Sequence, residues 1–277
     1  MMGRFLFFPV LRVNQAKLQH QLAGKRVLIT GASYGIGECL AERLADTGAH
    51  LLLVARTAEK LQEVQQRVAA KGGWADSFPC DLTDRAAVDA LLSQLQPLGA
   101  IDIVVNNAGK SIRRSIFDSL DRFHDFTRTM NLNYFGPVQL LLALIPGLVA
   151  QRGQVINISA INVLLAPMPM WAAYQASKSA FDQWLRTVAP ELNARGVATT
   201  TIYLPLVRTR MIEPTAAYKK MPAMQPDEVA ALICRAILSG KQRYMPWWLP
   251  AAQLASLLFR RPWEILMTWQ SRREQVK

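Results

Sequence analysis

A tyrosine and a lysine four residues apart are the pair in this sequence best suited to acid–base chemistry. Tyr174 and Lys178 fall in a stretch predicted to be helical, so their side chains project from the same face. A free tyrosine has a pKa of about 10 and is a poor acid–base group at neutral pH. A neighbouring ammonium favours the phenolate and lowers that pKa, which suits Tyr174 to proton transfer. An ordinary surface pair with the same spacing is the alternative.

A glycine-rich loop follows the first predicted strand, Lys25–Thr30, and precedes a predicted helix at Ile36–Thr47. Glycines let the backbone turn sharply and let a pyrophosphate approach the helix N-terminus, where free N–H groups and the helix dipole favour anions. The strand before the loop and the helix after it predict a nucleotide site rather than only a tight turn. The loop reads Thr30-Gly31-Ala32-Ser33-Tyr34-Gly35-Ile36-Gly37.

The residue that ends the second predicted strand, His50–Ala55, indicates which dinucleotide binds. A site specific for NAD needs an acid there to accept from the adenosine ribose 2′-hydroxyl. This chain has Arg56 instead, and a guanidinium suits a 2′-phosphate through its charge and its fork geometry. A solvated arginine at the end of the sheet is the alternative. We therefore expect NADP(H).

Two more strand ends carry residues suited to the same cofactor. Asp81 and Leu82 end the third predicted strand, where a carboxylate can accept from the adenine amino group. The run Asn106-Asn107-Ala108-Gly109 ends the fourth strand, where small residues admit the cofactor ribose and the amides brace the sheet. In isolation this run would be a turn, because Asn and Gly are turn formers.

Strands and helices alternate along most of the chain. This alternation predicts an α/β fold with a parallel sheet covered by helices on both faces. No repeat, linker or composition break divides residues 25–245, so we expect one catalytic domain there, an N-terminal extension at 1–24 and a C-terminal segment at 246–277. The predicted strands are 25–30, 50–55, 75–81, 101–105, 154–159 and 197–204, and the predicted helices are 36–47, 57–71, 85–95, 120–150, 172–195 and 227–238.

Composition narrows the classes of protein. Of the 277 residues, 51% are apolar and 19% charged, which excludes a disordered or fibrous chain. The three cysteines are far apart, which argues against a disulfide framework or a metal site. The net charge of +12 is concentrated at the two ends, and this placement argues against nucleic-acid binding. We find no spanning run of about 20 uninterrupted apolar residues and no secretory signal, so we expect a cytoplasmic protein.

Together these motifs resemble the classical short-chain dehydrogenase/reductase family over about residues 25–245. The resemblance implies a single Rossmann-type, doubly wound parallel sheet of about seven strands. It also implies reversible hydride transfer between a nicotinamide and a carbonyl or alcohol carbon, and a homodimer or homotetramer. Tyr174 would then give or take the proton, while Lys178 would bind the nicotinamide ribose and tune the tyrosine. The resemblance further implies that a segment containing Pro205, Val207 and Thr209 closes over the carboxamide.

The resemblance also assigns a helix asparagine and shows one departure. Asn133 matches the asparagine that holds a water linking Lys178 to solvent, with Asn131 as the neighbouring alternative. The family usually has a serine before the tyrosine, often the second of a Ser-Ser pair. Here the pair is Ser159-Ala160, and the segment to Tyr174 is one residue longer. Either Ser159 supplies the hydroxyl through a shifted loop, which we favour, or alanine has replaced it at a cost of roughly 10²–10³ in rate.

Two apolar segments border the expected substrate side. Methionine-rich walls suit a flexible lipophilic substrate, although they could pack on one another or on a partner subunit. The sequence at Pro205–Thr215 is also similar to reductases of long-chain acyl or fatty aldehyde carbonyls. The walls are Val163–Trp171, after the fifth strand, and Met211, Ile212, Pro214, Tyr218, Met221 and Met224, after the sixth.

The C-terminal segment combines tryptophans, leucines and arginines. Tryptophan and cationic side chains around an apolar stripe are typical of a helix that lies on anionic lipid, so we expect peripheral contact with the inner face of a membrane. The apolar run Phe5–Leu11 could add a second contact. A dimer-forming tail, or one folded back over the substrate cleft, is the alternative. Among its residues are Trp247, Trp248, Leu254, Leu257, Leu258, Phe259, Arg260, Arg261, Trp263, Trp269, Arg272 and Arg273.

The sequence thus predicts an NADPH-dependent reductase of a lipophilic carbonyl, either a long-chain 3-oxoacyl group or a fatty aldehyde. The alternative is a catalytically weak NADP(H)-binding scaffold at a membrane surface.

Overall fold

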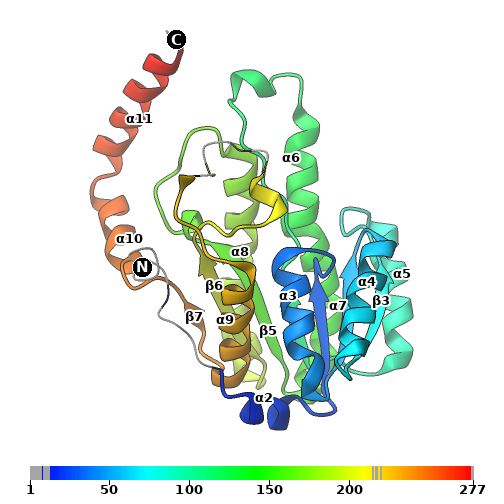
Figure 1. Ribbon diagram of the computed structural model, residues 1–277. Coiled ribbons are helices and arrows are strands. Elements are labelled where there is room, and N and C mark those ends of the chain that lie inside the picture. The colour runs from blue at the N-terminus through cyan, green and yellow to red at the C-terminus, as the bar shows by residue number, and fades with distance from the viewer. Residues whose placement is uncertain (1–7, 9–12, 214, 216–217, 219, 276–277) are drawn as a thin grey trace.

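The computed structural model describes residues 8, 13–213, 215, 218 and 220–275 (Figure 1). Its centre is one sheet of seven strands in the order β3-β2-β1-β4-β5-β6-β7, and every neighbouring pair is parallel. The predicted α/β fold is confirmed. The strands are β1 (Arg26–Thr30), β2 (His50–Ala55), β3 (Trp74–Pro79), β4 (Ile103–Asn106), β5 (Gln154–Ala160), β6 (Ala198–Leu204) and β7 (Arg243–Tyr244).

Helices cover both faces of this sheet. Successive side chains of a strand point to opposite faces, so Val27 and Ile29 of β1 join one core cluster while Leu28 joins the other. The first face is covered by α3 (Gly35–Leu44), α4 (Ala58–Ala70) and α9 (Pro226–Ser239), and the second by α5 (Arg85–Leu95), α7 (Gly136–Gln151) and α8 (Ala172–Ala194). The parallel arrangement brings all strand carboxyl ends to one edge, where the sequence motifs lie.

The helix predicted at 120–150 begins later and is interrupted. It consists of α6 (Phe123–Met130), a π-helix at Asn131–Phe135 and then α7. A π-helix widens the turn, and such turns occur frequently at functional sites. The interruption lies at Asn133, one of the predicted site residues.

By length and composition, the continuous helical run Phe123–Gln151 could cross a membrane, with a mean hydropathy of 1.6 over its most apolar window. The sequence analysis expected no such span. In this fold Leu140, Leu141 and Leu148 are buried in the second core cluster, so one side of the run packs against the core of the domain. Phe135 and Leu142 on the same run are exposed. The homodimer or homotetramer stays a prediction.

The two ends of the chain differ in how they pack. Near the N-terminus, α2 (Gln15–Leu22) buries Leu18 and Leu22 in the first core cluster. Phe8 packs against that cluster, while the rest of the predicted Phe5–Leu11 contact lies outside the described residues. At the C-terminus, α10 (Leu249–Leu258) and α11 (Arg260–Gln275) extend from the body as an arm (Figure 1).

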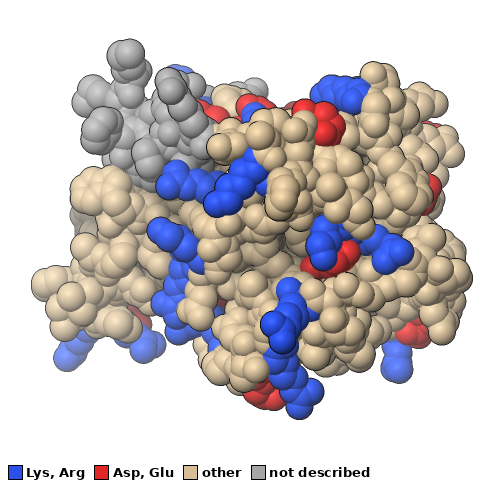
Figure 2. All heavy atoms as spheres, turned by 90° about the horizontal axis from the view of Figure 1, so that it is seen from below, with Lys and Arg blue, Asp and Glu red and all other residues tan. Residues whose placement is uncertain are grey.

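Charge is dispersed on the face at the amino ends of the strands, where α2 lies. Figure 2 shows Lys and Arg side chains there in several separate groups, with acidic residues beside some of them. The excess of positive charge in the sequence therefore does not form one continuous stripe on this face.

Candidate active site

The glycine loop turns in a conformation that its glycines make possible. Gly31 and Gly35 have φ of +68° and +60°, in the left-handed region that favours glycine. A Cβ on Gly37 would lie 2.3 Å from the carbonyl oxygen of Gly31, so this position keeps the start of α3 close under the loop. The backbone thus presents the α3 N-terminus at the strand edge, as predicted for an anion site.

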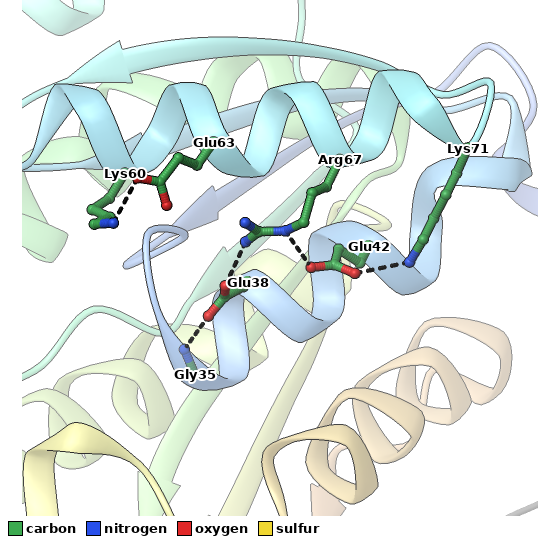
Figure 3. A network of polar contacts seen from close by, with 7 residues as sticks. All are labelled: Gly35, Glu38, Glu42, Lys60, Glu63, Arg67 and Lys71. Carbon is green, nitrogen blue, oxygen red and sulfur yellow. Dashed lines mark hydrogen bonds and ion pairs between the residues drawn. The ribbon is translucent and has the colours of Figure 1, made fainter.

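A carboxylate network supports this helix start (Figure 3). Gly35 N donates to Glu38 Oε2 at 3.0 Å, and Arg67 of α4 forms an ion pair with Glu38. Arg67 Nε and Lys71 Nζ each lie 2.8 Å from Glu42. The arginine compensates the negative charge that Glu38 brings to a helix end suited to phosphate. Sequence reasoning missed this network, because it joins side chains of two helices.

The asparagine run after β4 braces the sheet, mainly through Asn107. Its Nδ2 donates to the carbonyl oxygens of Thr30, at 2.9 Å, and Gly31, at 3.2 Å. Thr30 Oγ1 in turn accepts from the backbone N–H groups of Asn107 and Ala108, both at 3.0 Å. Asn106 is buried within the sheet and donates to Asn157 Oδ1. Asn107 therefore lines the pocket, and the predicted Asn106 acts behind it.

The predicted adenosine-side residues lie at the expected strand ends but outside the main pocket. Asp81 Oδ1 accepts from the backbone N–H and the hydroxyl of Thr83, which fixes the carboxylate. Leu82 is buried in the second core cluster. Arg56 follows β2, is exposed, and has no ion-pair partner among the described residues. The guanidinium is therefore available to an anion.

Tyr174 and Lys178 lie on the first turns of α8 and both line the pocket. Burial raises the pKa of Tyr174 to about 12, and nearby Tyr218 adds to the rise. Burial lowers the pKa of Lys178 to about 8. The expected lowering of the tyrosine pKa is thus not seen in the protein alone, because desolvation outweighs any effect of the ammonium. Tyr174 therefore holds its proton at neutral pH.

Lys178 and Asn133 are close to each other behind Gly109. Lys178 Nζ donates to the carbonyl oxygen of Ile158 at 3.1 Å, and a Cβ on Gly109 would lie 3.3 Å from both Lys178 Nζ and Asn133 Oδ1. Asn133 Nδ2 donates to Ser177 Oγ at 2.9 Å. Its amide also exchanges two hydrogen bonds with the Lys110 backbone.

Asn131, the neighbouring alternative, lies farther from this group. Its Nδ2 is 3.5 Å from the carbonyl oxygen of Thr83, on the side of the strand end after β3. The geometry therefore favours Asn133 over Asn131 as the asparagine beside Lys178.

The Ser159-Ala160 pair lies at the end of β5, and both residues line the pocket. The Ser159 hydroxyl is buried and has no hydrogen-bond partner among the described residues. Asn162 Oδ1, two residues beyond Ala160, is also buried, unpartnered and part of the pocket lining. A buried polar atom without a partner is costly, so both side chains are suited to bind a polar ligand atom. Sequence reasoning did not select Asn162.

One pocket of about 850 Å³ joins these residues. Much of the predicted substrate wall lines it, including Met168, Trp171, Met211 and Tyr218. Met224 was predicted for this wall, but it is 4% exposed, packs in the first core cluster and forms a β-bridge to Val207. Pro214 lies outside the described residues. The predicted residues that line the pocket are Gly31, Ser33, Tyr34, Gly35, Ile36, Ala108, Gly109, Ser159, Tyr174, Lys178, Pro205, Val207 and Thr209.

The loop after β6 reaches across to the glycine loop. Arg210 lies over the Tyr34 ring, 4.2 Å from its centroid, in a cation–π contact. A Cβ on Gly35 would be 3.0 Å from Thr209 Cγ2, so the two loops touch. The segment with Pro205, Val207 and Thr209 thus borders the pocket opposite the helix start.

The C-terminal arm forms another wall of the pocket. Trp263 and Met267 of α11 line it. Trp263 Nε1 donates to the carbonyl oxygen of Pro167 at 3.0 Å, and Ser256 Oγ accepts from Ala166 N at 3.1 Å. The sequence left open that this segment folds back over the substrate cleft, and the side of the arm that faces the pocket does so.

The sequence model of the short chain dehydrogenase family matches residues 25–220, so the chain belongs to this family. Among curated relatives, a fatty acyl-CoA reductase of Acinetobacter baylyi is 49% identical over 231 residues, covering 83% of this chain and 78% of the relative. A fatty acyl-CoA reductase of Mycobacterium tuberculosis is 41% identical over 241 residues, covering 86% and 82%.

Solved structures agree with this assignment. A short-chain dehydrogenase from Sphingobium yanoikuyae in complex with NADPH is similar with a TM-score of 0.75 and 26% identity, over 87% of this chain and 95% of that one. A 3-oxoacyl (acyl-carrier-protein) reductase from Agrobacterium tumefaciens with NADP bound gives a TM-score of 0.71 and 28% identity, over 81% and 90%.

Proposed function

We propose that this short-chain dehydrogenase is an NADPH-dependent reductase of a long-chain fatty acyl carbonyl. The observation that carries the proposal is the pocket in which a half-buried tyrosine, a buried lysine, the glycine loop and a methionine-rich wall meet. The relatives named fatty acyl-CoA reductase support an acyl substrate, and the NADP-bound neighbours support the cofactor.

The residues present fit a nicotinamide dinucleotide. The positive-φ glycines let the loop pass close to its neighbours, because a Cβ on Gly31 would lie 2.9 Å from Ala108 Cα and one on Gly35 would lie 3.0 Å from Thr209 Cγ2. Backbone N–H groups at the α3 N-terminus suit the pyrophosphate. Asp81 is held by Thr83 for the adenine, and Lys178 for the nicotinamide ribose. Arg56 would pair with the 2′-phosphate. When bound, NADPH would supply the hydride that adds to the substrate carbonyl carbon.

Tyr174 supplies the proton in this proposal. Because its pKa is raised to about 12, the phenol is protonated at neutral pH and can give its proton to the carbonyl oxygen as negative charge develops there. Ser159 Oγ, buried and without a partner, would donate a hydrogen bond to the same oxygen. Afterwards the tyrosine would regain a proton by way of the Lys178 ammonium, which lies close to Asn133.

The pocket wall favours an apolar chain over a sugar or another polar substrate. Methionines are flexible and polarisable, so Met168, Met211, Met221 and Met267 can adapt to an alkyl chain. Ser159, Asn162 and Lys178 line the same pocket as Tyr174 and could bind a carbonyl head. We therefore expect kcat/KM to rise with chain length, because each buried methylene contributes about 0.8 kcal/mol of binding.

The test is a substrate panel with NADPH and NADH compared side by side. Fatty aldehydes, 3-oxoacyl thioesters and acyl-CoA thioesters of short and long chains would be supplied, and loss of the reduced cofactor followed by absorbance at 340 nm. We expect the long-chain members to be reduced with NADPH. Tyr174→Phe should lower kcat by roughly 10²–10⁴ because it removes the proton donor.

Tyr218→Phe is the matched control, since Tyr218 lines the same pocket and stacks on Trp171. It should keep kcat within about threefold, since no proton transfer is assigned to it. Equal turnover by Tyr174→Phe and the parent would refute the mechanism. NADPH binding without reduction of any carbonyl in the panel would favour the scaffold alternative.

A further inference from the structure

The C-terminal arm has two different sides. On α10, the partly buried residues Ala252, Gln253 and Ser256 recur at helical spacing, and Ser256 contacts the loop at Ala166. On α11, the residues that line the pocket also share one side, at spacings of three and four: Trp263, Met267, Gln270 and Ser271. We call this the inward face.

The opposite side of both helices is apolar and exposed. A helical residue advances by about 100°, so Ile265 and Trp269 lie away from the inward face of α11, while Leu266 lies at the border between the two sides. The exposed fractions, 58–71% on α10 and 48–62% on α11, are large for such side chains. This outward face comprises Leu254, Leu257, Leu258, Phe259, Ile265, Leu266 and Trp269.

Arginines flank the outward face. Arg261 and Arg272 are exposed, and by helical spacing they lie beside Ile265 on one margin of the stripe on α11. Arg273 lies over the Trp269 ring, 3.4 Å from its centroid. Among the described side chains of α10 and α11, Glu264 is the only acid, and it pairs with Arg260 at 2.9 Å. The outward face is therefore apolar with a surplus of positive charge.

We propose that the outward face lies on an anionic lipid surface and that the acyl substrate passes from this surface into the pocket alongside α11. The binding to lipid stands on the exposed stripe and its arginines alone, whereas the passage of substrate rests on the proposed function. Tryptophan suits the membrane–water interface, leucine and isoleucine the acyl region, and arginine the headgroups. One helix then contacts the lipid with one side and the catalytic pocket with the other.

Charge favours a lipid surface over a second copy of the chain. Two outward faces packed together would bring arginines against arginines, and the described acid that could offset them is already paired with Arg260. Anionic headgroups neutralise the same arginines, at about 1 kcal/mol for each basic residue near the surface. The arm also extends from the body, so lipid can approach it without displacing another described element (Figure 1).

The test is sedimentation of the full chain with vesicles, without cofactor. Vesicles of phosphatidylglycerol and phosphatidylcholine would be compared with vesicles of phosphatidylcholine alone. We expect binding to the anionic vesicles and about tenfold less to the neutral ones. The variant Ile265→Ser/Trp269→Ser should lower the partition coefficient by about tenfold or more. Arg261→Gln/Arg272→Gln should lower it only on anionic vesicles.

Phe117→Ser/Leu120→Ser is the matched control, because Phe117 and Leu120 are 68% and 79% exposed but lie outside the arm. It should bind vesicles like the parent. Circular dichroism and the melting temperature would verify that each variant is folded. Equal vesicle binding by parent and outward-face variants, or an equal loss in the control, would overturn the proposal. So would dissociation of an oligomer by the outward-face variants without any binding of vesicles by the parent.

A second experiment separates this inference from the reductase proposal. A water-soluble short-chain aldehyde should be reduced at the parent rate by Ile265→Ser/Trp269→Ser, whereas a long-chain aldehyde held in anionic vesicles should be reduced several-fold more slowly. Vesicle binding by a parent that reduces neither substrate would contradict the function while leaving the lipid surface intact. Equal rates on vesicle-held substrate would overturn the passage alongside α11.

Discussion

The cofactor half and the substrate half of this pocket are built in different ways. In the cofactor half, short loops follow β1, β2 and β4 directly, and each loop carries a motif that is contiguous in the sequence. The loops then contact one another across the sheet edge, as where Thr30 Oγ1 accepts from Asn107 N and Ala108 N. In the substrate half, three distant segments meet. The bonds from Ala166 to Ser256 and from Trp263 to Pro167 join residues 90 and 96 positions apart. The first half can be inferred from local spacing, and the second needs tertiary structure.

This difference has a functional consequence. The backbone of the cofactor half leaves little room for side-chain variation, since a Cβ on Gly37 would meet a carbonyl at 2.3 Å. The substrate half is made of adaptable side chains, above all methionines, so its specificity can change without disturbing the fold. Family membership therefore indicates the class of reaction. The pocket wall also includes α11, which lies outside the family match at 25–220.

A large effect is expected at the border between the halves, at Ser159 and Ala160. If Ser159 donates to the substrate oxygen, Ser159→Ala should lower kcat by roughly 10²–10³ and leave the Kd for NADPH unchanged. Steady-state kinetics and fluorescence titration of NADPH would measure the two effects. Asn162→Ala removes the second buried side chain of the described pocket lining that has a polar atom without a partner, and it should cost less, about tenfold, if Ser159 is the main donor.

Ala160→Ser is the matched control at this border. On its own it restores the Ser-Ser pair typical of the family. Combined with Ser159→Ala, it should not restore activity if Ser159 is the residue that donates to the substrate oxygen. Rescue would mean that the hydroxyl belongs at position 160. A larger loss from Asn162→Ala than from Ser159→Ala would move the oxygen-binding role to the asparagine.

Much of the fold and of the cofactor half could be predicted from the sequence. Strand runs such as His50–Ala55 are continuous and apolar because both of their faces are covered, and the glycine spacing reports backbone conformation directly. The limits lie where packing decides. Met224 has the composition of a substrate wall but is buried in the core through its bridge to Val207. The pattern of residues could not distinguish these two environments.

Two other features depend on contacts between distant side chains. The pairing of Arg67 with Glu38 joins α4 to the start of α3, and no spacing rule relates the two residues. The pKa of Tyr174 depends on desolvation, which outweighs the neighbouring charge that the sequence suggested. The sequence left several positions open for the C-terminal segment. The hydrogen bond from Trp263 Nε1 to the carbonyl oxygen of Pro167 places the inward face of α11 over the pocket.

A smaller effect is expected for Arg56, within the cofactor half. Arg56→Ala should raise the Kd for NADPH by about 10- to 30-fold, because a charge-assisted bond at an exposed site is partly screened by solvent. The Kd for NADH should stay within about twofold, since NADH has no 2′-phosphate. Titration of both cofactors against parent and variant measures the ratio. An equal loss for NADH and NADPH would mean that Arg56 supports the fold rather than the phosphate.

The smallest effect is expected for the titration of Lys178, which lies between the two halves. Its Nζ donates a hydrogen bond to the carbonyl oxygen of Ile158 in β5 and lies behind Gly109. Burial lowers the pKa of Lys178 to about 8, so the ammonium is present below pH 8 and is lost as the pH rises. Tyr174, with its pKa raised to about 12, keeps its proton over this range. Reduction should therefore slow by about five- to tenfold from pH 8 to 9, measured as kcat/KM. In Lys178→Arg the charge persists at all these pH values, so the activity that remains should show no such decline. A decline of equal steepness in that variant would assign the titration to another group, and a flat profile in the parent would remove the need for a charged lysine.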